Sequence, residues 1–138
     1  MRYLLDTNTW IHYLKSVASP VEARLRQIPV GQVVVCSVVR AELLHGARKY
    51  ERRNERVARI ERMLSPFRSL PFDDAAARDY ASIRDTLETS GQVIGANDLL
   101  IAAIAITHSL TLVTNDQGFG RVPGLVTEDW TAPYPSER

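Results

Sequence analysis

Short apolar runs alternate with longer mixed stretches along this chain. The runs over 3–5, 33–36 and 111–114 are rich in leucine and valine and have the length of buried strands. The stretches between them predict helices over 7–15, from Pro20 onward, over 37–49 and 52–64, from Asp73 or Asp74 to Thr86 or beyond, and over 97–108, with a last strand over 125–127. Strands separated by helices favour a parallel sheet with helices on both faces.

Helix start and stop signals support this division. Pro20 suits the first turn of a helix, and Ser37 is a typical residue just before one. Pro66 ends the charged helix before it, and Gly91 follows the end of the next helix. These signals place the predicted boundaries within a few residues.

Length and composition indicate one ordinary globular domain. The chain has 138 residues, of which 45% are apolar and 24% are charged, so it can bury a core without disulfides. We therefore expect an α/β fold over residues 1–131, with a central parallel sheet of about four to five short strands flanked by helices. Residues 132–138 contain two prolines and are expected to form a short flexible tail.

Cysteine content and hydropathy favour a cytoplasmic protein without membrane contact. Cys36 is the single cysteine, so no internal disulfide forms, and its place after three valines predicts a buried thiol. The longest apolar run, over 99–106, is far shorter than the roughly 20 residues of a membrane span. The start of the chain does not resemble a signal segment. A net charge of +1 leaves the partners open.

Four acidic residues fall at or near the ends of apolar segments: Asp6, Glu42, Asp98 and Asp116. Asp6 and Asp116 come directly after predicted strands, where open α/β sheets bind their ligands. Carboxylates that converge there repel one another unless a cation neutralises them. The pattern therefore predicts a divalent metal site.

Each acid also has a structural explanation that does not involve metal. Asp6 would cap the helix that begins at Thr7, and Asp98 would stabilise the positive end of a helix dipole. Asp116 stands among residues that are common in turns. Glu42 lies on the same side of its predicted helix as two valines, and a buried carboxylate there is costly unless it is paired or bound to a metal. The four acids together are more specific than any one of them.

In this order the motifs resemble the PIN domain. The resemblance rests on Asp6-Thr7-Asn8 after the first strand, Glu42 in a helix, the Asn-Asp-Leu-Leu-Ile-Ala-Ala stretch over 97–103, and Leu112 to Asp116 with Phe119 beyond. It covers almost the whole chain, whose length is similar to that of the VapC toxins of bacterial toxin–antitoxin pairs. The resemblance implies an endoribonuclease dependent on Mg²⁺ or Mn²⁺, a homodimer, and a cognate antitoxin that covers the active site.

The resemblance also implies roles for individual residues. The acidic quartet of the family falls on Asp6, Glu42, Asp98 and Asp116, and its assisting polar positions fall on Asn8 and Thr114. Our hypothesis gives the central ligand role to Asp6, completed by Asp98 and Asp116, while Glu42 binds metal or orders water. Asn8 and Thr114 would orient these ligands. Whether one metal ion or two are bound stays open.

A dense run of basic residues surrounds position 50. Arg48, Arg52, Arg53 and Arg56 belong to it, with glutamates interspersed at spacings that allow helical ion pairs. One interpretation is a solvated helix held by salt bridges. The other is a surface that contacts RNA phosphates or an acidic antitoxin segment, because phosphate neutralisation dominates nucleic-acid affinity.

Two rival functions stay open on sequence grounds. A receiver domain or an acid-based phosphatase would share the aspartates, but no lysine lies near Asp116, and Asp6-Thr7-Asn8 lacks the second aspartate common in such phosphatases. A non-catalytic α/β module could instead use its basic helix to hold nucleic acid or a protein. Binding without metal and without cleavage would favour that module. The class of target RNA is not predicted.

Overall fold

Five parallel strands form the centre of the molecule in the computed structural model, which describes residues 1–15 and 18–132. The strands are β1 (Tyr3–Leu5), β2 (Val33–Cys36), β3 (Arg68–Leu70), β4 (Thr111–Val113) and β5 (Thr127–Glu128). They lie side by side in the order β3-β2-β1-β4-β5, and every neighbouring pair is parallel. The predicted α/β architecture with about four to five short parallel strands is confirmed.

The strand order creates a switch point beside β1. The chain places β2 and β3 on one side of β1, then returns to place β4 and β5 on the other. Leu4 pairs with Val34 of β2 and with Leu112 of β4, so β1 is central. In open α/β sheets the crevice at such a point, outside the carboxyl ends of the strands, is where ligands bind.

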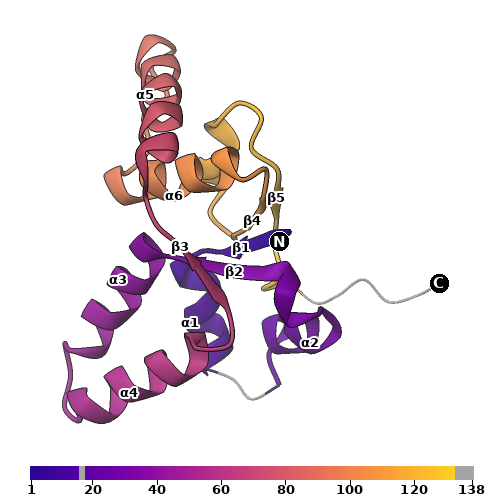
Figure 1. Ribbon diagram of the computed structural model, residues 1–138, viewed down its shortest axis with the longest axis vertical. Helices are drawn as coiled ribbons and strands as arrows, with labels where there is room; N and C mark the ends of the chain where they lie inside the picture. Colours follow the sequence, from indigo (N-terminus) through magenta and orange to yellow (C-terminus); the bar gives the residue numbers. More distant parts are fainter. Residues whose placement is uncertain (16–17, 133–138) are drawn as a thin grey trace.

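The described residues form six α-helices: α1 (Thr7–Lys15), α2 (Pro20–Gln27), α3 (Ser37–Ala47), α4 (Arg53–Leu64), α5 (Asp74–Thr89) and α6 (Ala96–Thr107). Short 3-10 helices lie at Val30–Gln32 and Gln117–Arg121. Figure 1 shows α5 and α6 on one side of the strands and α1, α2 and α4 on the other. Helices on both faces explain why the central strands β1, β2 and β4 are almost entirely apolar.

The core lies between the sheet and these helices. Leu4, Val34 and Leu112 are fully buried in the three central strands. Residues 101–105 of α6 are buried without interruption, because the helix packs against both the sheet and α5. Trp10 from α1 is also fully buried and packs against Phe67, with ring centroids 5.5 Å apart.

Several predicted helix signals act as expected. Pro20 occupies the first turn of α2. Asp73 caps α5, its carboxylate accepting a hydrogen bond from the amide of Ala76 at 3.0 Å. Gly91 follows the end of α5 with a φ of +70°, a conformation that glycine adopts at little cost.

Three local predictions are wrong. Cys36, not Ser37, precedes the first turn of α3, and the Ser37 hydroxyl instead donates to the carbonyl of Leu70 at 3.4 Å. The helix also ends at Ala47, two residues before the predicted end. The last strand forms at Thr127–Glu128 and not over 125–127. Strand β3 was not predicted, because only its final residue is buried at this edge of the sheet.

No helix in the described part of the chain is both long and apolar enough to cross a membrane. The flexible tail predicted over 132–138 lies outside the described residues except for Ala132, so it stays a prediction, as does the domain boundary at 131.

Candidate active site

The four acids predicted from sequence line one cleft of about 170 Å³. It opens where β1 and β4 end, at the switch point of the sheet. The cleft is lined by Asp6, Thr7, Asn8, Glu42, Asp98, Ile101 and Asp116. The acids come from four separate segments: the end of β1, the middle of α3, the first turn of α6 and the loop after β4. The fold therefore brings together carboxylates that are up to 110 positions apart (from 6 to 116).

Asp6 both caps a helix and lines the cleft. One carboxylate oxygen accepts a hydrogen bond from the Thr9 amide at 2.9 Å, so the predicted cap is present. The residue is only 5% exposed. Burial raises the pKa of the Asp6 carboxyl, the negative charge of Asp116 adds to this, and hydrogen bonds from Thr114 and Thr9 oppose it. The two interpretations of Asp6 are therefore compatible.

Glu42 is held at both oxygens. The hydroxyl of Thr7 donates to Oε1 at 2.5 Å, and the side-chain amide of Asn97 donates to Oε2 at 3.3 Å. Thr7 is the first residue of α1 and Asn97 is in the first turn of α6. No role was predicted for either residue, although both belong to the motifs around Asp6 and Asp98. They fix a carboxylate that would otherwise be repelled by its acidic neighbours.

Asp98 faces the other acids from the first turn of α6. Burial raises the pKa of its carboxyl, and the negative charges of Asp116, Glu42 and Asp6 raise it further. Within the part of the chain that the structure describes, no side chain donates a hydrogen bond to it. Its oxygens are therefore available to a ligand in the cleft.

Asp116 shapes the loop after β4. Its carboxylate accepts a hydrogen bond from the Gly118 amide at 2.8 Å, and its own amide donates to the Thr114 hydroxyl at 3.0 Å. Thr114 is buried and interacts with both Asp116 and Asp6. Asn8 is exposed at the rim of the cleft. The two polar positions predicted to assist the acids thus lie next to them.

The cleft suits a hydrated divalent cation better than a closed protein cage. Across residues 1–15 and 18–132, no basic side chain forms an ion pair with any of the four acids. In the same residues no three acidic, histidine or cysteine side chains form a ready-made ligand cluster. Mg²⁺ is commonly held by one or two carboxylates and keeps several waters. Oxygen donors around a cleft with raised carboxyl pKa values fit that binding mode.

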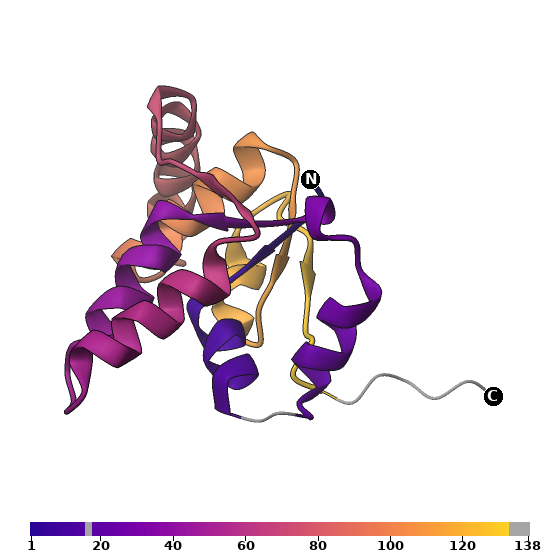
Figure 2. The same cartoon turned by 60° about the horizontal axis from the view of Figure 1, so that its bottom comes forward.

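The structure does not bring the predicted basic residues into the acidic cleft. Arg48, Arg52 and Arg53 lie at the turn between α3 and α4, which projects away from the strands in Figure 2. Arg56 lines a neighbouring groove. In the described residues none of the four forms a salt bridge. Ion pairs within this helix, which the spacing of its glutamates allows, do not form among the described residues, and Glu61 of α4 instead pairs with Arg40 of α3 at 3.1 Å.

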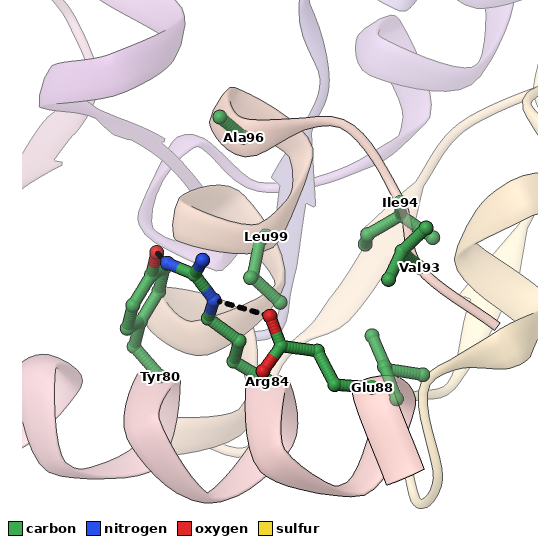
Figure 3. A pocket seen from close by; sticks show the side chains of 8 residues that line it. Tyr80, Arg84, Glu88, Val93, Ile94, Ala96 and Leu99 are labelled. Atoms are coloured by element: carbon green, nitrogen blue, oxygen red, sulfur yellow. Dashed lines mark hydrogen bonds and ion pairs between the residues drawn. The ribbon is translucent and has the colours of Figure 1, made fainter. Parts of the chain in front are cut away.

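A second hollow, of about 190 Å³, lies between α5 and the segment that leads into α6 (Figure 3). Its charged groups are already satisfied: Arg84 donates to Glu88 at 3.0 Å and to the Tyr80 hydroxyl at 3.0 Å. The Arg84–Glu88 pair is drawn as a dashed line in Figure 3. This internal pairing leaves little free polar chemistry, so the acidic cleft is the better candidate site.

A family model for the PIN domain matches residues 3–125, a span that includes all four acids. The chain belongs to the PIN domain family. The match explains the shared fold and confirms the family predicted from the motifs.

Relatives of this PIN domain are similar over nearly their whole length. The tRNA(fMet)-specific endonuclease VapC of Shigella flexneri is 36% identical over 132 residues, which cover 95% of this chain and 99% of the relative. Ribonuclease VapC2 of Haemophilus influenzae is 37% identical over 131 residues, covering 94% and 98%. Among solved structures, the DNA-bound VapBC of Salmonella typhimurium matches with a TM-score of 0.89 at 31% identity, covering 94% of this chain and 98% of that one.

Proposed function

We propose that this chain is the toxin of a toxin–antitoxin pair, an endoribonuclease that hydrolyses RNA phosphodiester bonds and is inhibited by a cognate antitoxin. Relatives that cover nearly the whole chain are named ribonucleases or a tRNA endonuclease. Similar solved structures are VapBC complexes, two of them with DNA. The observation that carries the proposal is the convergence of four carboxylates at the switch point of a PIN domain.

A divalent cation, Mg²⁺ or Mn²⁺, would be held by Asp6, Asp98 and Asp116. Asp6 accepts hydrogen bonds from Thr9 and Thr114, and Asp98 accepts no side-chain hydrogen bond in the described residues, so both carboxylates keep oxygen lone pairs that can bind a metal ion. A bound cation would supply Lewis acidity, lowering the pKa of water and stabilising negative charge on the phosphate. The raised pKa values of Asp6 and Asp98 would return toward their usual range on binding.

Glu42 is assigned to ordering the attacking water. Both of its oxygens already accept hydrogen bonds, from Thr7 and Asn97, so its position is fixed before substrate arrives. A carboxylate in that position can orient a water in line with the scissile phosphate and accept its proton. Two polar residues would keep the neighbouring ligands in place. Thr114 accepts a hydrogen bond from the amide of Asp116, and Asn8 lies at the rim of the cleft.

The basic surface around Arg48, Arg52, Arg53 and Arg56 would attract the RNA backbone. None of these four arginines forms a salt bridge in the described residues, which supports a role in phosphate binding. Reversing the charges of Arg52, Arg53 and Arg56 should weaken RNA binding and flatten its salt dependence. An unchanged slope of log affinity against log salt concentration would show that these three arginines do not contact the RNA phosphates.

The assembly that we propose is a homodimer that acts in the cytoplasm and is silenced by its antitoxin. The alternative is a binding module that holds nucleic acid or a protein without cleaving it. The unpaired basic surface agrees with either function, but the four facing carboxylates carry an electrostatic cost that binding alone does not explain.

The decisive experiment exposes total bacterial RNA, and separately purified initiator tRNA, to the antitoxin-free protein with Mg²⁺, with Mn²⁺ or with chelator. We expect discrete fragments that require metal, and end-mapping of these fragments would name the cut site. Intact RNA in every lane, from folded protein that binds metal, would favour the binding module.

A further inference from the structure

An exposed tyrosine stands in a basic setting in the turn that follows α3, at the groove that adjoins the acidic cleft. Tyr50 is 64% exposed and follows α3 in the turn toward α4. The guanidinium of Arg56 lies over its ring, 5.4 Å from the centroid. The Nε of Arg56 also donates to the carbonyl of Glu51 at 3.2 Å, which holds the guanidinium in this position. The ring is thus oriented by its neighbours but is not buried as part of the core.

Tyr50 lines a groove of about 440 Å³ between α1, α3 and α4. Glu42 lines both this groove and the acidic cleft, so the two are adjacent. Ile11, Leu43 and Ile60 contribute an apolar floor. A strand of nucleic acid that passes along the groove would therefore reach the carboxylates.

Four cationic side chains line the same groove: Lys15, Lys49, Arg56 and Arg59. Across the described residues none of them forms a salt bridge. Arg59 is instead anchored on the carbonyl of Leu14 at 3.3 Å. Four cations beside an open aromatic ring, two of them (Arg56 and Arg59) held by backbone carbonyls, match the requirements of a single strand, in which phosphates and base faces alternate.

We propose that Tyr50, backed by Arg56, stacks on an unpaired base of the RNA substrate near the scissile phosphate. This rests on the proposed ribonuclease function and adds a substrate property: the RNA is single-stranded or has its bases unstacked at this site. Stacking on aromatic rings and guanidinium planes is the usual way in which proteins hold unpaired bases. An apolar protein segment is the competing occupant of the groove, and the four unpaired cations favour RNA.

The test compares Tyr50→Ala with Tyr50→Phe, which keeps the ring, and with Val30→Ala, which truncates an exposed side chain outside the groove. Binding of a fluorescent single-stranded RNA is measured by anisotropy in chelator, and the KM for cleavage is measured with Mg²⁺. Tyr50→Ala should weaken binding and raise KM by roughly 5- to 150-fold, the range for one stacked base. Tyr50→Phe and Val30→Ala should resemble the unaltered protein.

An abasic RNA series identifies the stacked base. Removing that base should weaken binding to the unaltered protein but have no further effect on Tyr50→Ala, because the two changes delete the same contact. Equal affinity of Tyr50→Ala and the unaltered protein for RNA would overturn the proposal. So would a Tyr50→Ala protein that binds RNA normally but no longer binds the antitoxin. Loss of binding in Tyr50→Ala together with intact RNA in every lane would instead retain the stacking site and reject the ribonuclease.

Discussion

Replacing Thr7 by valine should destabilise the protein and impair the site, although Thr7 touches no substrate in our account. The substitution keeps the shape of the side chain and removes the hydroxyl that donates to Glu42 at 2.5 Å. Glu42 would retain only the longer bond from Asn97, at 3.3 Å. A partly buried carboxylate would then lose its better donor while three other acids surround it.

The expected loss can be estimated from this one contact. A hydrogen bond to a charged group typically contributes about 1.5–3 kcal/mol, and we take the low end or less because the Thr7–Glu42 bond is only partly buried and water can replace part of it. We expect the free energy of unfolding to fall by about 1–1.5 kcal/mol. For a chain of this size, that corresponds to a decrease in Tm of roughly 3–5 °C. Because partners that orient a catalytic ligand typically matter by about 10- to 100-fold, kcat/KM should fall within that range.

Urea unfolding and RNA cleavage with Mg²⁺ measure the two effects. Thr7→Ser, which retains the hydroxyl, is the matched control and should stay close to the unaltered protein. A double-mutant cycle with Glu42→Ala isolates the pair, because Thr7→Val should cost little once the acceptor is gone. If Thr7→Val is equally costly with and without Glu42, or if it changes neither stability nor activity, the hydrogen bond does not position Glu42.

The raised carboxyl pKa values and the buried thiol give two further predictions. The pKa values of Asp6 and Asp98 lie above the usual 3.8, so their contribution to stability is full below pH 3.8 and is lost as pH rises through the raised values. In chelator, stability from urea unfolding should therefore include a component that grows on acidification, and saturating Mn²⁺ should suppress it; identical pH profiles with and without metal would contradict this. Burial raises the pKa of Cys36 to about 11, so Ellman's reagent at pH 8 should label the thiol only at the rate of unfolding. Rapid labelling of the folded protein would show that the thiol is accessible.

The apolar runs predicted most of the fold because the central strands are buried on both faces. Strands β1, β2 and β4 need continuous apolar residues, and the sequence displays them directly. Strand β3 lies at the edge, where Arg68 and Ser69 are exposed, so its short polar sequence resembles a loop. Strand β3 pairs with β2 only because the intervening helices α3 and α4 return the chain to the edge of the sheet, and that return is not visible in a local sequence pattern.

The candidate site could be predicted in part for a related reason. Asp6 and Asp116 follow strands, and position in an α/β sheet identifies such residues. The partners of Glu42 were not predictable in this way. Thr7 is 35 positions from Glu42 and Asn97 is 55 positions away, and no local pattern links residues at such separations. The family resemblance identified Asp6 and Asp98, the neighbours of Thr7 and Asn97. The structure is needed to show that Thr7 and Asn97 donate hydrogen bonds to the two carboxylate oxygens of Glu42.

The most direct test of the central claim is the rate of Mg²⁺-dependent RNA cleavage by Asp6→Asn. Asparagine is as good a helix cap as aspartate, so the hydrogen bond to Thr9 and the fold should survive while the charge is lost. Asp85→Asn, on the exposed side of α5, controls for the loss of one negative charge outside the cleft. Loss of a group that only orients a metal ligand typically costs about 10- to 100-fold, so our account predicts a loss of at least about 100-fold when the ligand itself is changed in Asp6→Asn, and an unchanged rate in Asp85→Asn. Full metal-dependent cleavage by a folded Asp6→Asn protein would contradict it.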